Sequence, residues 1–331
     1  MAEYHGSVHQ FAKITAGKGI NYFQWKIVIF GALKTLCVTN LTFQKKSGLL
    51  WVLAVVITLS AAFYQRYTGP TNPKSLTLTV AGGQYTLFCP RSLRTEVTPL
   101  QAQGNWEGLE YTSVLKIKVK GKEGADPLPA DTQVGIYYRR VSSNAPWLWA
   151  AGVVGAGGHI EVTLPSQPPA GKLSYFPEVA GDPLSKEAPL VIRFRNNVPA
   201  WVLVPHILLM YGVMLLSTMC GLLSWLHRPR WRQYVWLTLA ALFVGGFILG
   251  PLVQKFAFGA YWTGWPWGDD LTDTKTLIAA IFWIVALLFS NKKIGRYLSM
   301  LAAIALLAIY SIPHSASGSQ FNYDTGLVET E

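Results

Sequence analysis

Two kinds of hydrophobic pattern alternate along this chain. The first kind is a long apolar run, and there are five of them, at residues 48–64, 198–226, 234–256, 274–290 and 294–313. A helix needs about 20 apolar residues to cross a bilayer. The second and third runs exceed this length, while the first and fourth are near the lower limit. The last two are joined through the short polar stretch NKKIGR, which predicts a helical hairpin, so we expect five membrane crossings.

The second kind of pattern lies between the first two apolar runs. Here short segments alternate apolar and polar side chains, as half-buried β-strands do. They include LTLTV, SVLKIKVKG, VGIYYRRV, HIEVTLP, GKLSYFPEV and PLVIRFRN, and Pro- and Gly-rich stretches such as PLPAD and SQPPAG separate them. Regular short strands with turns between them are typical of a β-sandwich of the immunoglobulin or fibronectin type.

The sequence therefore predicts an α-helical membrane protein with about five transmembrane helices and an inserted, extracytoplasmic all-β sandwich. Within the first 47 residues, the segment 21–43 contains two lysines, and we expect it to lie on the inner leaflet or, alternatively, to re-enter the membrane. The expected boundaries are 1–47 for a cytoplasmic arm, 48–67 for the first span, 68–197 for the sandwich, 198–320 for a four-helix membrane domain with a Trp-rich outer loop at 257–273, and 321–331 for an extracytoplasmic tail.

Charge sets the expected orientation. The net charge is +11, and lysines and arginines gather in the N-terminal arm, after the second apolar run and after the fourth. By the positive-inside rule these three regions face the cytoplasm. A bacterial-type inner membrane fits this pattern, with no cleavable signal peptide. The bilayer explains the basic residues, so we expect no nucleic-acid partner.

Cysteines and catalytic motifs add little. The three cysteines, Cys37, Cys89 and Cys220, are assigned to different compartments and no pair is expected to form a disulfide. The chain has no C-x-x-C-H motif for covalent haem. It also has no nucleophile beside a base and no phosphate-binding glycine loop, so no enzymatic reaction is recognisable.

The loop GAYWTGWPWGDDLTDTKTLI carries the strongest functional signal. Its tryptophans suit a membrane interface, and His206 and His314 are both placed on the same outer side. A histidine in an apolar helix usually faces a protein interior or a ligand, although histidines also cap helices and contact headgroups. A haem needs a flat aromatic face, two imidazoles and cations for its propionates. The candidate residues are Trp262, Trp265 and Trp267 for the face, His206 and His314 as metal ligands, and Lys275, with Lys255 and Arg66, for the propionates.

This arrangement resembles the haem-handling membrane proteins of cytochrome c biogenesis, over about residues 200–320. Thr272 stands where that family places a tryptophan. The resemblance implies that the loop supports haem and that the two histidines are axial ligands. The matching positions are Gly259, Ala260, Trp262, Trp267, Gly268, Asp273, Lys275 and Thr276, together with the histidine segments 206–217 and 313–319.

Two functional hypotheses follow. One is an outer-leaflet haem-binding protein, acting in cytochrome c assembly, whose sandwich docks a partner such as a cytochrome. The other is a non-catalytic accessory subunit of a membrane redox or photosynthetic complex. Asp269, Asp270 and Asp273 are also suited to capping the helix of the fourth apolar run, which Asp273 directly precedes. In the β-rich part, His159 reads as an ordinary edge histidine, and Trp147 and Trp149 as core packing, a lipid-facing hairpin tip or a partner contact.

Overall fold

The computed structural model describes residues 48–69, 71–97, 111–122, 127–141, 145–155, 158–313, 319–323 and 325–329. The chain divides into two units, Met1–Leu53 and Ala54–Glu331. The expected cytoplasmic arm, the segment 21–43, Cys37 and His314 lie outside the described residues. The strands and the helices after residue 198 belong to the second unit, and the helix Gly48–Thr68 begins in the first.

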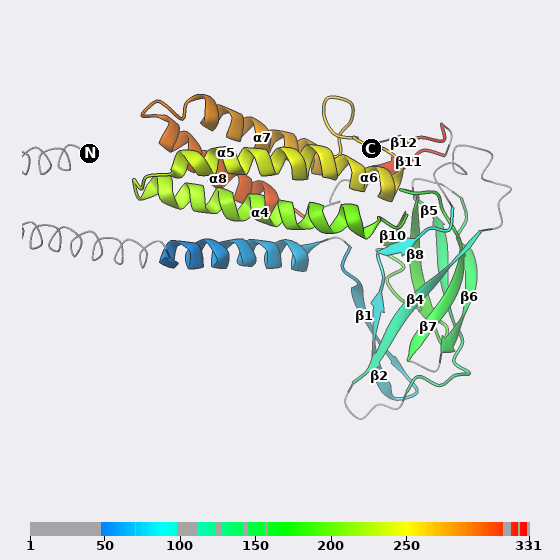
Figure 1. The fold of residues 1–331 in the computed structure, drawn as a ribbon. Coiled ribbons are helices and arrows are strands. Elements are labelled where there is room, and N and C mark those ends of the chain that lie inside the picture. Colours follow the sequence, from blue (N-terminus) through cyan, green and yellow to red (C-terminus); the bar gives the residue numbers. More distant parts are fainter. Residues whose placement is uncertain are drawn as a thin grey trace, which may run out of the picture. The chain divides into compact units, whose positions relative to one another are not determined.

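The β-rich region forms one curled, mixed sheet that makes a half-barrel (Figure 1). Along the sheet the strand order is β1-β2-β4-β7-β6-β5-β8-β10-β3, and β9 pairs with β8. All neighbours are antiparallel except β10 and β3. The bounds are β1 (Lys74–Val80), β2 (Gly83–Cys89), β3 (Ser92–Arg94), β4 (Thr112–Gly121), β5 (Val134–Arg140), β6 (Leu148–Gly155), β7 (His159–Pro165), β8 (Lys172–Val179), β9 (Asp182–Pro183) and β10 (Leu190–Arg195).

The prediction of a helical protein with an inserted two-sheet sandwich was therefore wrong. Period-two alternation indicates that one face of each strand is buried. It does not say whether a second sheet or the curl of the same sheet covers that face. Here the inner face of the curled sheet buries one continuous cluster, which includes Leu87, Leu115, Ile136, Ile160 and Tyr175.

Four helices in the described part of the chain are long and apolar enough to cross a membrane. They are Gly48–Thr68, α4 (Ala200–Trp225), the continuous helix Trp231–Phe258 and α7 (Leu271–Leu288). The third consists of α5 (Trp231–Leu242), a π-helical turn η2 (Phe243–Leu249) and α6 (Gly250–Phe258). The fifth apolar run forms α8 (Gly295–Ser311), a shorter apolar helix, so the described residues contain four candidate crossings where five were expected. The chain is thus built to associate with a membrane.

Small residues let the helices approach closely. A Cβ added at Gly221 of α4 would lie 2.8 Å from the Ala303 side chain of α8. Trp283 of α7 is completely buried in the helical core. Contacts of this kind stabilise helix pairs in lipid, where the hydrophobic effect is absent.

The C-terminal segment returns to the sheet. It forms a short hairpin of β11 (Gln320–Phe321) and β12 (Val328–Glu329). The backbone N–H of Phe321 donates to the carbonyl of Ala170, and the hydroxyl of Tyr323 donates to Oε1 of Gln167 at 2.8 Å. The tail therefore lies on the same side of the helices as the sheet.

Candidate functional site

The Trp-rich loop begins where α6 ends and finishes at the first turn of α7. Gly259, at φ +92°, terminates α6 in a left-handed conformation that glycine adopts easily. Lys255 donates from Nζ to the Gly259 carbonyl at 2.7 Å. At the other end, Asp270 caps α7 by accepting from the N–H of Thr272 at 2.7 Å. The predicted capping role thus falls to Asp270, three residues before Asp273.

Asp273 holds the loop against α7. Its Oδ2 accepts from the backbone N–H of Thr263 at 2.7 Å and of Gly264 at 3.1 Å. Asp273 is only 7% exposed, so these are buried, charge-assisted hydrogen bonds of the stronger kind. A Cβ added at Gly264 would come within 2.4 Å of the Asp273 side chain. The loop and the start of α7 are therefore in close contact.

The three tryptophans of the loop have different surroundings. Trp262 stacks on Phe247 of η2, with ring centroids 5.8 Å apart, and its Nε1 donates to the carbonyl of Gly264 at 3.0 Å. Trp265 is 60% exposed and Trp267 is 82% exposed. Trp262 therefore packs the loop against the third helix, whereas the side chains of Trp265 and Trp267 lie on the surface.

Lys275 is directed away from the surface. It is 2% exposed, and its Nζ donates to the carbonyls of Ile312 at 2.9 Å and Pro313 at 3.4 Å. These carbonyls lie at the C-terminal end of α8, where a cation is favoured by the helix dipole. In this structure Lys275 thus joins α7 to the end of α8.

His206 lies on α4 and faces the π-helical turn. Its Nδ1 donates to the carbonyl of Gly245 at 2.9 Å. Because a carbonyl oxygen only accepts, the proton must be on Nδ1, which leaves a lone pair on Nε2. Among the described residues, no hydrogen bond joins His206 to Trp262, Trp265 or Trp267, and Trp262 packs on Phe247 instead.

Arg193 of β10 connects the sheet to the loop and the tail. Its Nη2 donates to the carbonyl of Ser319 at 2.6 Å and to the hydroxyl of Ser319 at 2.9 Å, and its guanidinium lies 3.9 Å from the ring centroid of Phe258. The N–H of Ser319 in turn donates to Asp270. Burial lowers the pKa of Arg193 to about 10, opposed by the nearby Asp270 carboxylate. Arg193 could not be singled out from the sequence, because it has the pattern of any polar position on an alternating strand.

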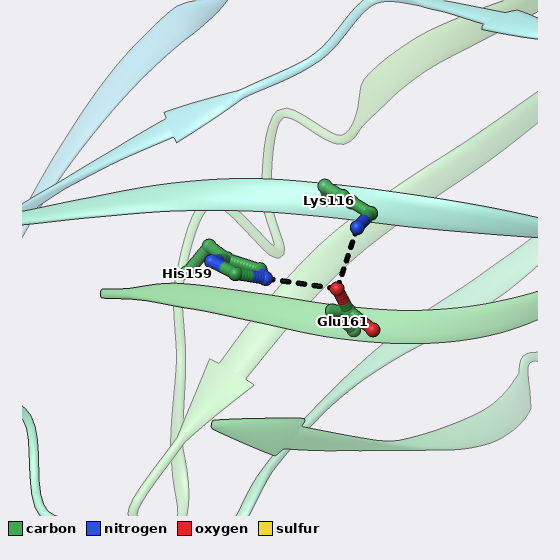
Figure 2. A network of polar contacts seen from close by, with 3 residues as sticks. All are labelled: Lys116, His159 and Glu161. Carbon is green, nitrogen blue, oxygen red and sulfur yellow. Dashed lines mark hydrogen bonds and ion pairs between the residues drawn. The ribbon is translucent and has the colours of Figure 1, made fainter. Parts of the chain in front are cut away.

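The other face of the sheet carries two further groups. In the first, Glu161 of β7 accepts from Lys116 of β4 at 2.7 Å and lies 2.8 Å from Nε2 of His159 (Figure 2). The Lys116 hydrogen bond, followed by that of His159, lowers the pKa of Glu161. His159 thus takes part in a surface hydrogen-bond network, and it begins β7, an interior strand of the sheet, so it is a surface histidine that does not lie on an edge strand.

The second group is an aromatic row across β6, β5 and β8. Trp149 and Phe176 lie opposite Tyr137 in the strand register, with ring centroids 4.9 Å and 5.0 Å from the Tyr137 ring. Trp147 packs on Phe176 at 4.9 Å, and the guanidinium of Arg139 lies 4.4 Å from its ring. The row is on the face opposite the core cluster, and Trp149 remains 37% exposed.

In the part of the chain that the structure describes, no group of three or more His, Cys, Asp or Glu side chains is placed to hold a metal ion. Comparisons with protein-family models, curated proteins and solved structures yield no match to this chain.

Proposed function

We propose that this chain is a haem-binding membrane protein in which Nε2 of His206 would bind the haem iron. The orientation of the His206 ring carries this proposal. Histidines that ligate metals almost always donate their other ring N–H to a carbonyl or carboxylate, which fixes the ring and makes the free nitrogen more basic. The bond from Nδ1 to the Gly245 carbonyl is of this type.

The backbone around His206 also supports a ligand. Gly245 lies in a π-helical turn, and its carbonyl accepts the N–H of Gly250 as well as the His206 proton. Single π-helical turns occur frequently at functional sites, because they change the direction of a helix locally. Glycine at position 245 also allows α4 to pack closely against η2. A Cβ added at Gly245 would lie 2.9 Å from the Leu209 side chain of α4, which is too close for an ordinary contact.

The residues present fit part of what a haem requires. His206 offers an imidazole nitrogen, and Trp265 and Trp267 offer exposed aromatic surface on a fixed loop. Lys275 already bonds the end of α8, so in this proposal it does not pair with a propionate. The second predicted ligand, His314, lies outside the described residues. Bound haem would supply redox-active iron, and the chain would hold and orient it.

Within this proposal, the chain handles haem on the outer side of a bacterial-type inner membrane, for cytochrome c assembly. The half-barrel and the tail then face the extracytoplasmic space, where the half-barrel docks the apoprotein partner. The supporting observation is that the sheet, the Trp-rich loop and the tail are joined through Arg193, Ser319 and Asp270. A cofactor held at this end of the helices would lie beside the docking domain.

The test is a haem titration of the purified protein, followed by the Soret band. His206→Gln keeps an N–H donor for the Gly245 carbonyl and removes the imidazole. His227→Gln is the matched control, because His227 also bonds a backbone carbonyl through Nδ1, that of Trp225 at 2.9 Å, and lies after the opposite end of α4.

We expect saturable haem binding by the wild type and by His227→Gln, with a Soret band that His206→Gln loses. A wild-type protein that binds no haem, or a His206→Gln variant with an unchanged spectrum, would contradict the proposal.

The aromatic row favours a second candidate function, an accessory subunit of a larger membrane redox or photosynthetic complex. Large aromatic side chains with an arginine beside them are enriched at protein interfaces. In this case Trp149→Ala and Tyr137→Ala would release the chain from a stoichiometric assembly in native membranes, and Lys116→Ala, on the same face, would not. A chain that migrates alone in native membranes would exclude this function.

A further inference from the structure

A groove of about 940 Å³ runs between the helix Gly48–Thr68 and α4. The side chains that form its walls are mostly apolar, and several are well exposed. Phe63 is 73% exposed and Leu208 is 65% exposed. The side chains that line it include Val55, Leu59 and Phe63 from the first helix and Leu208, Tyr211 and Leu215 from α4.

The groove has the length of one membrane leaflet. Val55 and Arg66 mark its two ends on the first helix, and at 1.5 Å per residue they are about 16 Å apart along the axis. Half of a hydrocarbon core of roughly 30 Å is about 15 Å. One acyl chain of a lipid in a single leaflet would therefore fill the groove from end to end.

Arg66 lies at the end of the groove that leads to the sheet, since β1 begins at Lys74. The side chain of Asn72 donates to the backbone carbonyls of Arg66 and Tyr67, both at 2.7 Å, and so holds the end of this helix. Within the described ranges, no carboxylate forms an ion pair with its guanidinium. Tyr64 and Tyr67, 56% and 78% exposed, flank it as residues at a membrane interface do.

An arginine at this position is suited to a phosphate. Guanidinium binds phosphate oxygens through two parallel N–H donors, and it is less strongly hydrated than an ammonium group. A neutral occupant, such as a second apolar helix, would leave this cation without a partner at the membrane surface. The charge therefore favours a negatively charged lipid over a protein segment.

We propose that this groove is a binding site for one anionic phospholipid, whose acyl chain lies along the apolar walls and whose phosphate bonds Arg66. The occupant is a bilayer lipid such as phosphatidylglycerol. This site is separate from the proposed haem ligand, because His206 faces the π-helical turn on another side of α4. Failure of one proposal leaves the other unaffected.

Gly212 makes the site testable. It lines the groove, and a Cβ added to it would meet no atom within 4 Å. Gly212→Leu would therefore place a side chain in the groove without a clash, and it replaces glycine with a better helix former. Arg66→Gln removes the charge and leaves the apolar walls intact. Matched controls are Lys74→Gln, an exposed cation in β1 that lies eight residues after Arg66, and Ile304→Phe, which adds bulk at a 63% exposed position of α8.

The experiment measures retention of phosphatidylglycerol and phosphatidylcholine by the purified full chain, using native mass spectrometry from mixed micelles. We expect a preference for phosphatidylglycerol of about fivefold, since one basic residue near an anionic surface contributes about 1 kcal/mol. Arg66→Gln should abolish this preference, Gly212→Leu should lower retention of both lipids, and neither control should change either result.

Three results would overturn the proposal. The first is a preference that survives in Arg66→Gln, and the second is unchanged lipid retention by Gly212→Leu. The third is a dimer that excludes lipid and that Gly212→Leu dissociates, which would show that a second copy of the chain fills the groove. Unfolding midpoints of the four variants close to that of the wild type would show that lipid loss does not reflect misfolding.

Discussion

Replacing Asp273 should loosen the Trp-rich loop more than any other single change in it. The Asp273 carboxylate is buried and accepts from two backbone amides, those of Thr263 and Gly264. Removing the acceptor from a buried donor costs about 1–3 kcal/mol. Asp273→Ala leaves two such donors, so the free energy of unfolding should fall by about 2–6 kcal/mol.

Asp273→Asn tests how much of this stabilisation comes from the charge of the Asp273 side chain, because asparagine removes the charge and keeps an acceptor oxygen. Its side-chain oxygen can still accept both hydrogen bonds, but neutral hydrogen bonds contribute about 1 kcal/mol less than charged ones. We therefore expect a loss of about 2 kcal/mol, smaller than that of Asp273→Ala. Asp269→Ala is the control, because Asp269 is exposed in the same loop, and changes at such surface sites usually stay within about 0.5 kcal/mol.

Two measurements test this order of effects. Equilibrium unfolding in mixed micelles gives the free energies, and amide hydrogen exchange of peptides containing Thr263 and Gly264 reports the loop itself. Exchange should accelerate in Asp273→Ala and remain slow in Asp269→Ala. If the two alanine variants show the same stability and the same exchange, Asp273 does not hold the loop and the reasoning from its hydrogen bonds is refuted.

Three further predictions concern single side chains. Lys275→Met should destabilise the protein by about 1–3 kcal/mol, because the carbonyls of Ile312 and Pro313 lose their buried donor. Amide hydrogen exchange at the end of α8 should become faster, and unchanged exchange there would contradict the prediction. Cys89 is completely buried and its pKa is raised to about 12, so a water-soluble maleimide at pH 8 should label it only after unfolding, as read by peptide mass spectrometry. The pKa of Glu161 is lowered from 4.5 in the folded state, so its polar contacts stabilise the sheet above pH 4.5. Glu161→Gln should therefore be slightly less stable than the wild type at neutral pH. This difference in stability should disappear as the pH falls below 4.5 and Glu161 becomes protonated. A difference that persists in acid would show that the effect is not one of charge.

Some of the candidate site could be predicted from the sequence. The indoles of Trp265 and Trp267 belong to a polar loop between two apolar runs, which places them at a helix end and leaves them exposed. An aspartate just before an apolar run indicates a helix cap, and Asp270 takes that role. These features depend on neighbours in the chain, and so the local pattern contains them.

The targets of the buried charges could not be predicted. Lys275 was expected near a ligand, and it bonds the carbonyls of Ile312 and Pro313, more than 35 residues away. Arg193 reaches Ser319 across 126 residues. A long polar side chain gives no sign in the sequence of which distant carbonyl it will reach, since that depends on how α7, α8 and β10 pack.

By itself, the sequence determined that the chain combines apolar helices with strands that have one buried face, because length and periodicity are local properties. Only the tertiary structure decided that the strands form one curled half-barrel instead of a two-sheet sandwich. The same is true of the His206 bond to Gly245 and of the groove between the first helix and α4. Each of these depends on pairing between residues far apart in the chain, which hydrophobic patterning does not specify.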